Sequence, residues 1–397
     1  MEHRNNQLTV NGDTGGAGSP GQATEGAVGT AVVRSDGPGA PVEPESPRRS
    51  RGLRAGVGRV TQSASERAVR IGLLVVQLGP VLMLVAIGIG MAIASPFFLT
   101  ERNITNLAIQ SSPIVALALG QFLVILTRGI DISVGSVIGL VCALGGVLFE
   151  DGRGSILTLV LMILAGVAVG LANGLLFVKG RLPHAFIATL ATYGIARGVA
   201  LLLTDGKVIP GQNSLVEDIG QGLVAGVPVP ALLVAGLAAL TWVLTRRLQW
   251  GRWIYAIGGD PEAARRVGIP VDRVLISVYA FCGLAAGVAG LITAGRTGVG
   301  DASAGQLAEL DSIAAVMIGG VSFLGGRGAV LNAVVGALTV ATIRNGLNLQ
   351  GVTAFWELVA IGGIIIVAVE LNVVREHLEE RFRVLQATAD GKREAPR

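Results

Sequence analysis

Residues Gly154–Val178 read GSILTLVLMILAGVAVGLANGLLFV, an unbroken stretch without a single charged side chain. A bilayer core about 30 Å thick is crossed by a helix of roughly 20 apolar residues, so this stretch is long enough to span a membrane. Its apolar residues are continuous and do not alternate with polar ones, which excludes a strand of a membrane β-barrel. The stretch therefore predicts a transmembrane helix.

The rest of the chain repeats this pattern. Of its 397 residues, 51% are hydrophobic and only 15% are charged, whereas soluble domains contain about 25% charged residues. Further long charge-free runs lie at Ile71–Thr100, Asn103–Thr127, Ile132–Phe149, Ile219–Thr245 and Val274–Gly295. Shorter or interrupted runs lie at Leu182–Ala196, Ser312–Gly326, Gly328–Ile343 and Leu358–Val369. The sequence thus predicts an all-α polytopic membrane protein with about ten transmembrane helices, some of them discontinuous, in contact with membrane lipid.

Two tails flank the membrane part. Residues 1–68 are rich in Gly, Ser, Pro, Glu and Arg and contain no aromatic Phe, Trp or Tyr. Such a composition buries too little apolar surface to offset the entropy of ordering, so it predicts a disordered N-terminal tail. Residues 69–373 form the predicted transmembrane domain, with a polar loop at 250–273, and residues 374–397 form a C-terminal tail.

The distribution of basic residues predicts the orientation. Five arginines precede the first apolar run, and the positive-inside rule places them in the cytoplasm. They are Arg51, Arg54, Arg59, Arg67 and Arg70. With ten alternating spans, most Lys and Arg residues of the connecting loops then also fall in the cytoplasm. Both tails and the polar loop are therefore expected on the cytoplasmic side.

Several function classes are excluded by missing patterns. The chain contains no G-x-x-x-x-G-K-[ST] phosphate-binding loop, no G-x-S-x-G, no H-E-x-x-H and no C-x-x-C. We expect no catalytic centre, no cofactor and no metal site, and hence no enzyme. The basic residues form no continuous face, which argues against a nucleic-acid partner. Cys142 and Cys282 lie inside apolar runs and are interpreted as packing residues.

Two segments interrupt the apolar runs with glycine. Thr127–Gly135 reads TRGIDISVG, and Met317–Gly328 reads MIGGVSFLGGRG. Non-helical backbone is tolerated at membrane depth only if it is buried in protein or lines a watery cavity. The alternative is that these glycines merely allow close helix packing. Possible pathway or helix-break residues in the two segments are Asp131, Gly135, Gly319 and Gly320.

Charged residues within the spans are the other pathway candidates. Arg197 lies in the fifth predicted span, where a charge costs roughly 2.5–3.5 kcal/mol, so it should face the protein interior and have a partner. Tying two helices together is favoured for Arg197 over contact with a solute. Asp131 follows Arg128 by three residues and could pair with it on a helix, although shaping the turn is favoured over contact with a solute.

Two acidic residues stand at the mouth of a further span, in the stretch Gly305–Gly320. Glu309 and Asp311 could orient a hydroxylated solute or pair with Arg296. Acidic residues also suit the positive end of a helix dipole, and this structural role is the favoured one.

The polar stretch Gly258–Arg273 reads GGDPEAARRVGIPVDR and separates two apolar runs. Asp260 can cap a helix and Pro261 can start it. Glu262 to Val267 then supply about one and a half turns, and Gly268 with Pro270 ends the helix. Ala263 and Ala264 leave this helix slender, so that it would fit a groove in a partner. The alternative is an ordinary solvated loop.

At this point the sequence resembles the membrane permease of ABC importers for monosaccharides of the ribose, xylose and galactose group. The resemblance runs from about Phe97 to Leu371. It rests on LTRGIDISVGSVIGL (Leu126–Leu140), LPHAFIATLATYGIARGVAL (Leu182–Leu201), GRWIYAIGGDPEAARRVGIPVDR (Gly251–Arg273), AELDSIAAVMIGGVSFLGGRG (Ala308–Gly328) and NGLNLQGV (Asn345–Val352).

The resemblance implies a bacterial plasma-membrane protein with several partners. A separate cytoplasmic ATP-binding subunit would dock on Glu262, Ala263, Ala264, Arg265 and Gly268, and a separate sugar-binding protein would deliver the solute from outside. Two permease copies would form a homodimer. Arg128 departs from the family pattern, which usually has a small residue there. Two alternatives remain: a permease of the same superfamily for branched-chain amino acids or nucleosides, and an ion-coupled secondary transporter, which the scarcity of intramembrane acids disfavours.

Overall fold

The computed structural model describes residues 78–353 and, after them, 355–357, 359–360, 362–363, 366 and 370. The two predicted tails, residues 1–68 and 374–397, lie outside the described residues. Within the described part, six helices are long and apolar enough to cross a membrane. They are α2 (Glu101–Leu126), α4 (Ser155–Lys179), α5 (Ala185–Leu203), α7 (Val229–Arg246), α10 (Val271–Thr297) and α12 (Val330–Leu349).

Shorter elements complete this part of the chain. The helix Leu78–Ala94 and α3 (Val134–Glu150) are apolar but shorter than a full span. The other short helices are α6 (Ser214–Gln221), α8 (Gln249–Gly259), α9 (Pro261–Arg266) and α11 (Ala308–Ile318). The strands β1 (Ile209–Pro210) and β4 (Val299–Gly300) pair antiparallel, as do β2 (Leu223–Val224) and β3 (Val227–Pro228). The prediction of an all-α polytopic membrane protein is confirmed.

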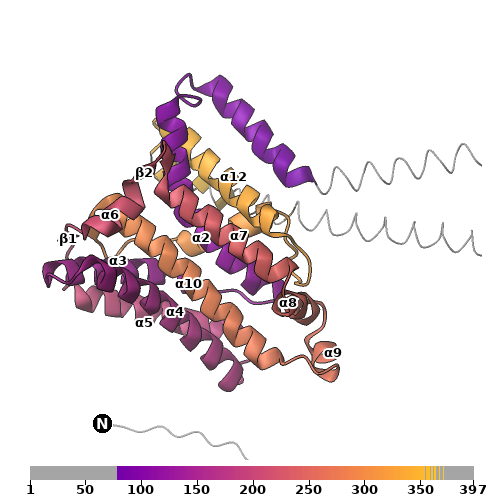
Figure 1. The fold of residues 1–397 in the computed structure, drawn as a ribbon. Coiled ribbons are helices and arrows are strands. Elements are labelled where there is room, and N and C mark those ends of the chain that lie inside the picture. Colours follow the sequence, from indigo (N-terminus) through magenta and orange to yellow (C-terminus); the bar gives the residue numbers. More distant parts are fainter. Residues whose placement is uncertain are drawn as a thin grey trace, which may run out of the picture. The chain divides into compact units, whose positions relative to one another are not determined.

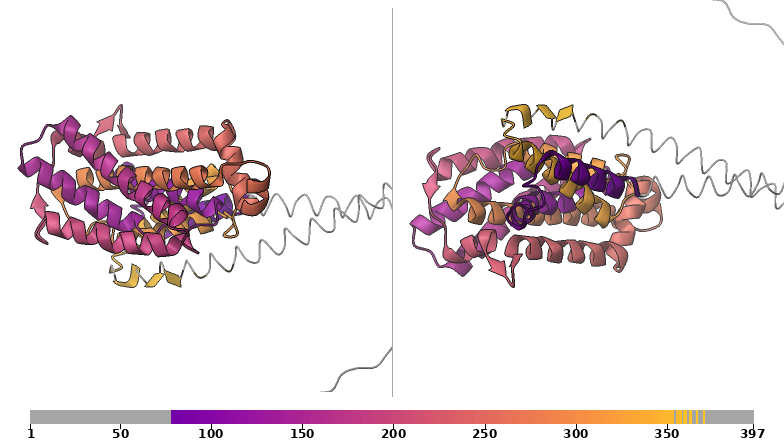
Figure 2. Two further views of the ribbon diagram at one scale, coloured as in Figure 1. Left: turned by 90° about the horizontal axis from the view of Figure 1, so that it is seen from below. Right: turned by 90° about the horizontal axis from the view of Figure 1, so that it is seen from above.

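The long helices run side by side between two ends (Figure 1). Strands β1 and β2 and helix α6 lie at one end, and α8 and α9 lie at the other. Both views in Figure 2 show α8 and α9, drawn in salmon, at the same end of the helices. A helix rises 1.5 Å per residue, so α10, with 27 residues, extends over roughly 40 Å from α9 to β4.

Helices α2 and α10 form the centre of the core. Leu117, Phe122 and Ile125 of α2 and Tyr279 and Ile292 of α10 are at most 1% exposed. The side chains that these helices bury are almost all apolar. Exposed large apolar residues are frequent on α4, α5 and α7, as expected for helices that face lipid.

A row of glycines brings α4 and α10 together. Gly166, Gly170 and Gly174 are spaced four residues apart on α4. Gly166 and Gly170 face Gly283 and Gly287 of α10, and Gly174 faces the Ile276 backbone of the same helix. A Cβ atom on Gly283 would lie 2.8 Å from the Gly170 Cα, closer than real Cβ contacts. Small residues at such a spacing let helix backbones approach closely in membranes. The packing interpretation of the glycines is therefore confirmed for this helix pair.

Two crossings are discontinuous, as predicted. Helix α2 ends at Leu126, and the chain runs through 127–133 without regular structure before α3 begins. Helix α11 has only 11 residues, and 319–329 continue after it to the α8 end, where the Gly326 amide donates to the Leu126 carbonyl. The segment 127–133 is mostly buried, whereas Phe323, Leu324 and Arg327 of the second segment are exposed.

Two boundary predictions need correction. The predicted loop 250–273 is mostly helical, because α8 and α9 occupy it and α10 already begins at Val271. The run Ile219–Thr245 is not one span: it contains the end of α6 and the β2–β3 hairpin before α7 begins at Val229. Turn glycines, such as Gly226 with a φ of 81°, interrupt this apolar run without adding any charge.

Candidate functional site

An open pocket of about 230 Å³ lies between helices α2, α3, α10, α11 and α12. It is lined by Gln110, Pro113, Ile114, Leu117, Ile138, Thr293, Arg296, Gly305, Gln306, Ala308, Asp311, Ala341 and Arg344. The charged and amide side chains among them come from four different segments of the chain. Discontinuous helices that bound a polar cavity are a recurrent way to build a solute site in transporters.

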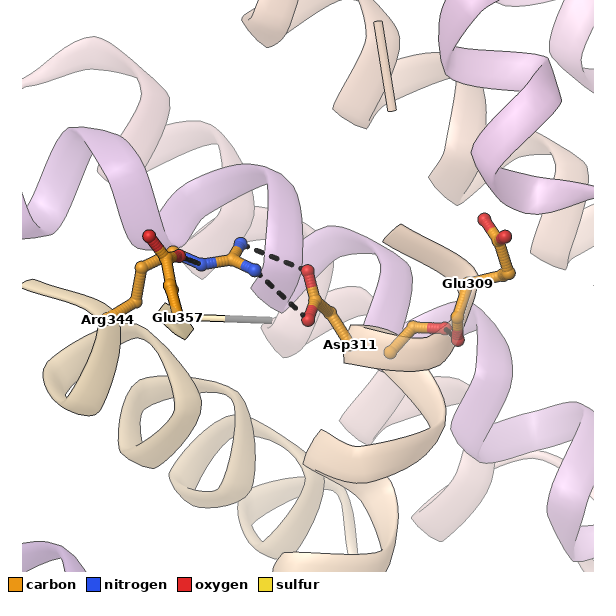
Figure 3. Close-up of polar contacts among 5 residues, drawn as sticks. Glu309, Asp311, Arg344 and Glu357 are labelled. Atoms are coloured by element: carbon orange, nitrogen blue, oxygen red, sulfur yellow. Dashed lines mark hydrogen bonds and ion pairs between the residues drawn. The ribbon is translucent and has the colours of Figure 1, made fainter. Parts of the chain in front are cut away.

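Two of the lining residues, Asp311 and Arg344, belong to a charged network (Figure 3). The guanidinium of Arg344 contacts both carboxylate oxygens of Asp311, with Nη1–Oδ2 at 3.0 Å and Nη2–Oδ1 at 3.3 Å. Its Nε also pairs with Glu357. Asp311 is 4% exposed. The suggested pairing of Asp311 with Arg296 is wrong, because Arg344, one element further along the chain, holds this carboxylate from α12.

Glu309 points away from that network (Figure 3). It is 5% exposed, and its carboxylate lies against Gly135, the second residue of α3. A Cβ atom on Gly135 would collide with this carboxylate and would lie 2.6 Å from the Gly305 carbonyl oxygen. Both Glu309 and Asp311 stand in the first turn of α11, where the helix dipole favours a negative charge.

Arg197 holds a loop in place. Its Nη1 donates to the main-chain carbonyls of Ala302 and Ala304, the latter at 3.3 Å. These carbonyls belong to the irregular segment between β4 and α11, and Gly139 of α3 leaves room for it. The expectation that Arg197 ties two helices together is therefore corrected: it ties α5 to non-helical backbone, whose carbonyls need donors inside a membrane protein.

Asp131 shapes the turn before α3, as the sequence suggested. Its Oδ1 accepts from the Ser133 amide at 2.9 Å and from the Ser133 hydroxyl at 2.7 Å. The Asn173 amide of α4 donates to Asp131 Oδ2 at 3.2 Å and to the Ser133 hydroxyl at 2.8 Å. Pairing of Asp131 with Arg128 is wrong, because α2 already ends at Leu126 and Arg128 has a φ of 64°.

Replacing Asp131 by alanine should lower the apparent melting temperature of the purified protein by several degrees. The change leaves the Ser133 amide without its acceptor and the buried Asn173 amide with the Ser133 hydroxyl alone, and a buried donor without an acceptor costs about 1–3 kcal/mol. Thermal unfolding in detergent measures the shift, and Asp218→Ala, an exposed residue of α6, is the control. Equal melting temperatures for the two variants would contradict a structural role for Asp131.

The glycines after α11 serve two different purposes. Gly319 lies against α12, because a Cβ atom there would meet the Asn332 carbonyl group. Gly320 has a φ of 76°, and its amide donates to the Met317 carbonyl at 2.8 Å while the Val321 amide donates to the Val316 carbonyl at 3.3 Å. This is a Schellman ending, in which glycine provides the left-handed residue.

At the opposite end, α9 is a short charged helix, as predicted. The Asp260 carboxylate accepts from the amides of Glu262 and Ala263 at 2.9 and 3.0 Å. The hydrogen bond from Ala263, reinforced by the one from Glu262, holds the pKa of Asp260 below its ordinary value. The helix ends at Gly268, with a φ of 83° and a second Schellman pair of hydrogen bonds.

The side chains of α9 divide into an anchor and an exposed face. Ala264 is 4% exposed and packs into the core cluster. Glu262, Ala263, Arg265, Arg266 and Val267 are exposed, with Val267 at 77%. Arg265 pairs with Asp272 of α10 at 3.2 Å. With an apolar anchor below a charged, exposed face, α9 is an ordered surface helix and not a loosely solvated loop.

Arg128 links α9 to the rest of the molecule. Its Nε donates to the Gly258 carbonyl at 2.7 Å and its Nη2 donates to the Gly259 carbonyl. These are the last two residues of α8, directly before α9. The end of α2, the end of α8 and the glycine loop at Gly325 and Gly326 thus meet in one place, which we call the Arg128 junction.

The pathway candidates are not gathered at one point. Asp311 lines the pocket, whereas Glu309, Gly135 and Arg197 form a second contact between α3, α5 and the segment before α11. Sequence reasoning missed Arg344 as the partner of Asp311 and Glu357 as the second partner of Arg344. The available signal was the charge of Arg344 close to the end of an apolar run, since a charge at that depth requires a partner.

Comparison with known proteins agrees with this architecture. Residues 103–369 match the family model described as branched-chain amino acid transport system / permease component. The ribose import permease protein of Bacillus subtilis (strain 168) is 40% identical over 298 residues, which cover 75% of this chain and 92% of that protein. The D-allose transport system permease protein of Escherichia coli (strain K12) is 37% identical over 282 residues, covering 71% and 86%.

The xylose transport system permease protein of Haemophilus influenzae is 33% identical over 360 residues, which cover 73% of this chain and 95% of that protein. No solved structure matches the chain. The similar proteins are transport components of importers and not enzymes themselves. The chain therefore belongs to the family of branched-chain amino acid transport system permease components, within which it is similar to the permease subunits of sugar ABC importers.

Proposed function

We propose that this chain forms the membrane pathway of an ATP-driven importer for a monosaccharide. The relatives named above are permease proteins for ribose, allose and xylose, each a single sugar. The chain has no phosphate-binding loop of its own. The energy is therefore supplied by a separate ATP-binding subunit, and a separate sugar-binding protein delivers the solute from outside the cell.

The observation that carries the proposal is the form of α9. A six-residue helix that is capped at its start, ended by glycine and anchored through Ala264 presents a fixed charged face. We assign the contact with the ATP-binding subunit to Glu262, Ala263, Arg265 and the turn at Gly268, with Ala264 as the anchor. This face is cytoplasmic in the proposed orientation, as are both termini, in a bacterial plasma membrane.

Two permease copies are expected to form a homodimer, as in the family that the sequence resembles. The exposed apolar side chains of α4, α5 and α7 supply area for a second copy and for lipid. The family description mentions branched-chain amino acids, so the nature of the solute has to be tested directly. Binding of ribose, xylose and leucine to the soluble partner protein separates these two classes of solute.

The experiment cross-links α9 in native membranes. Val267 is replaced by a photoreactive residue. We expect the cross-linked product to contain an ATP-binding subunit with a P-loop. Combining this change with Glu262→Arg should reduce the yield of that product at least fivefold, because it replaces the negative charge of α9 at position 262 by a positive one next to Arg265 and Arg266. Asp218→Arg on α6, an exposed acidic residue at the other end, should leave the yield unchanged.

Two results would remove the proposal. One is the absence of a nucleotide-hydrolysing subunit from the cross-linked products. The other is uptake that survives depletion of ATP and stops when an uncoupler is added, since that behaviour defines an ion-coupled secondary transporter.

A further inference from the structure

The polar pocket next to α11 has the features of a solute site, and nothing described above requires it for the fold. It opens to the surface between Gln110, Arg296 and Gln306, whose side chains are exposed, and it reaches inward to the buried Asp311. Its walls come from helices α2, α3, α10 and α12 and from α11 together with the irregular segment before it. Relative movement of these helices would change its shape.

The volume of the pocket limits the size of its ligand. Sites for drug-sized molecules measure roughly 300–1,000 Å³. The pocket measures about 230 Å³, and at about 30 Å³ for each liquid water it has room for one small ring with its hydroxyl groups. A disaccharide would extend out of it. The size therefore favours a single sugar unit or another small metabolite.

The charges of the lining residues disfavour a ligand with an ammonium group, such as an amino acid. Asp311 is held bidentately by Arg344, and Arg344 also pairs with Glu357. Asp311 is the single carboxylate among the lining residues, so no free carboxylate lines the pocket to receive an ammonium group. Arg296 has no ion pair among the residues that the structure describes.

The hydrogen-bonding groups of the pocket suit a sugar. Each sugar hydroxyl can donate and accept, and amide side chains can do both as well. Gln110 and Gln306 offer donors and acceptors, and Arg296 offers donors only. The Thr293 hydroxyl donates to the Ala289 carbonyl and so offers an acceptor. The bidentate contact holds Asp311 and Arg344 in one orientation, so these two lining residues present a fixed geometry to a ligand. The lining contains no aromatic ring, so binding relies on hydrogen bonds and should be weak enough to permit release.

We propose that this pocket is a transient binding station for one neutral monosaccharide, in which Arg296 and Gln306 bind the sugar hydroxyls above the Asp311–Arg344 pair. This proposal rests on the proposed function and adds a site within the permease itself. Selection of the solute then does not depend solely on the soluble binding protein. Because five segments contribute to the pocket, their rearrangement during transport would release the sugar.

The test measures protection of an engineered cysteine in the full-length permease, reconstituted in lipid nanodiscs. Cys142 and Cys282, both buried, are first replaced by alanine. Gln306→Cys is then labelled with a small thiol reagent in the presence of D-ribose, D-allose or D-xylose. At least one of these sugars should slow labelling about fivefold. Ser303→Cys, an exposed residue of the same segment that does not line the pocket, should be labelled at an unchanged rate.

A second variant tests the assigned role of Arg296. Arg296→Gln keeps a donor but removes the charge and the length of the guanidinium, and it should raise the half-protecting sugar concentration about tenfold at an unchanged melting temperature. Protection by leucine or by a sugar acid, but not by a neutral sugar, would overturn the assignment, as would no protection by any of these probes. If the importer takes up sugar but no sugar protects the cysteine at position 306 from labelling, the proposed sugar site is refuted and the proposed function is not.

Discussion

Replacing Gly283 by leucine is expected to reduce the yield of folded protein at least tenfold. A Cβ atom at this position would collide with the Gly166 carbonyl oxygen and would lie 2.8 Å from both the Cα and the amide nitrogen of Gly170. All three are backbone atoms of α4, which cannot rotate aside as a side chain can. The two helices must therefore separate along their whole contact.

The energetic cost follows from the place of α10 in the core. Adding atoms to a well-packed core costs about 1–3 kcal/mol even where side chains can adjust, and total stability is only about 5–15 kcal/mol. Here α10 packs against α2, α3, α4 and α6 at once, so that separating α10 from α4 disturbs each of these contacts. A variant of this kind should be degraded or aggregate on extraction.

Size-exclusion chromatography of detergent extracts measures the monodisperse fraction. Gly236→Leu is the matched control, because Gly236 lies within the long helix α7 and a Cβ atom there would meet nothing within 4 Å. This control should behave like the unchanged protein. If Gly283→Leu gave the same monodisperse fraction as Gly236→Leu, the close approach of α4 and α10 would be refuted.

Much of this fold follows from local sequence signals. Charge-free runs mark the long helices, because a bilayer tolerates only segments whose backbone groups are satisfied internally. The start and end of α9 follow from Asp260, Pro261 and Gly268, whose effects on the backbone act within a few residues. These predictions succeeded because the determining contacts lie close together along the chain.

The side-chain partners of the charged residues could not be predicted in the same way. Asp311 and Arg344 are 33 residues apart, and their meeting depends on how α11 and α12 cross. Arg197 pairs with main-chain carbonyls, which every residue possesses and which therefore leave no mark in a sequence. For Arg128, the rule for pairs three residues apart on a helix failed because the helix ends before it.

Replacing Arg128 by alanine should lower sugar uptake about tenfold or more without preventing the ATP-binding subunit from docking. The guanidinium donates to the last two carbonyls of α8, which have no partners within their own helix. Hydrogen bonds of charged groups are worth about 1.5–3 kcal/mol each. Since Arg128 is partly exposed, we expect its two hydrogen bonds together to stabilise the Arg128 junction by about 2 kcal/mol. Their loss corresponds to a roughly 30-fold lower population of the intact junction.

The location of the Arg128 junction explains why transport and docking should respond differently. The exposed face of α9 does not include Arg128, so the docking surface persists in the variant. However, α2 carries Gln110, Ile114 and Leu117 of the pocket at a distance of several turns from this junction. We expect a movement of α9 to reach α2 through Arg128 and, by way of the Leu126–Gly326 hydrogen bond, the loop that follows α11.

Proteoliposomes that contain the complete importer measure the ratio of sugar molecules taken up to ATP molecules hydrolysed. Arg128→Ala should lower this ratio. Arg252 is an exposed arginine of α8, and Arg252→Ala should leave the ratio unchanged. Arg128→Gly removes the strain of a φ of 64° along with the guanidinium, so a ratio as low as that of alanine assigns the effect to the lost hydrogen bonds. An unchanged ratio in both Arg128 variants would mean that α9 transmits its movement through α10 alone, since α10 begins directly after α9 and ends beside the same pocket.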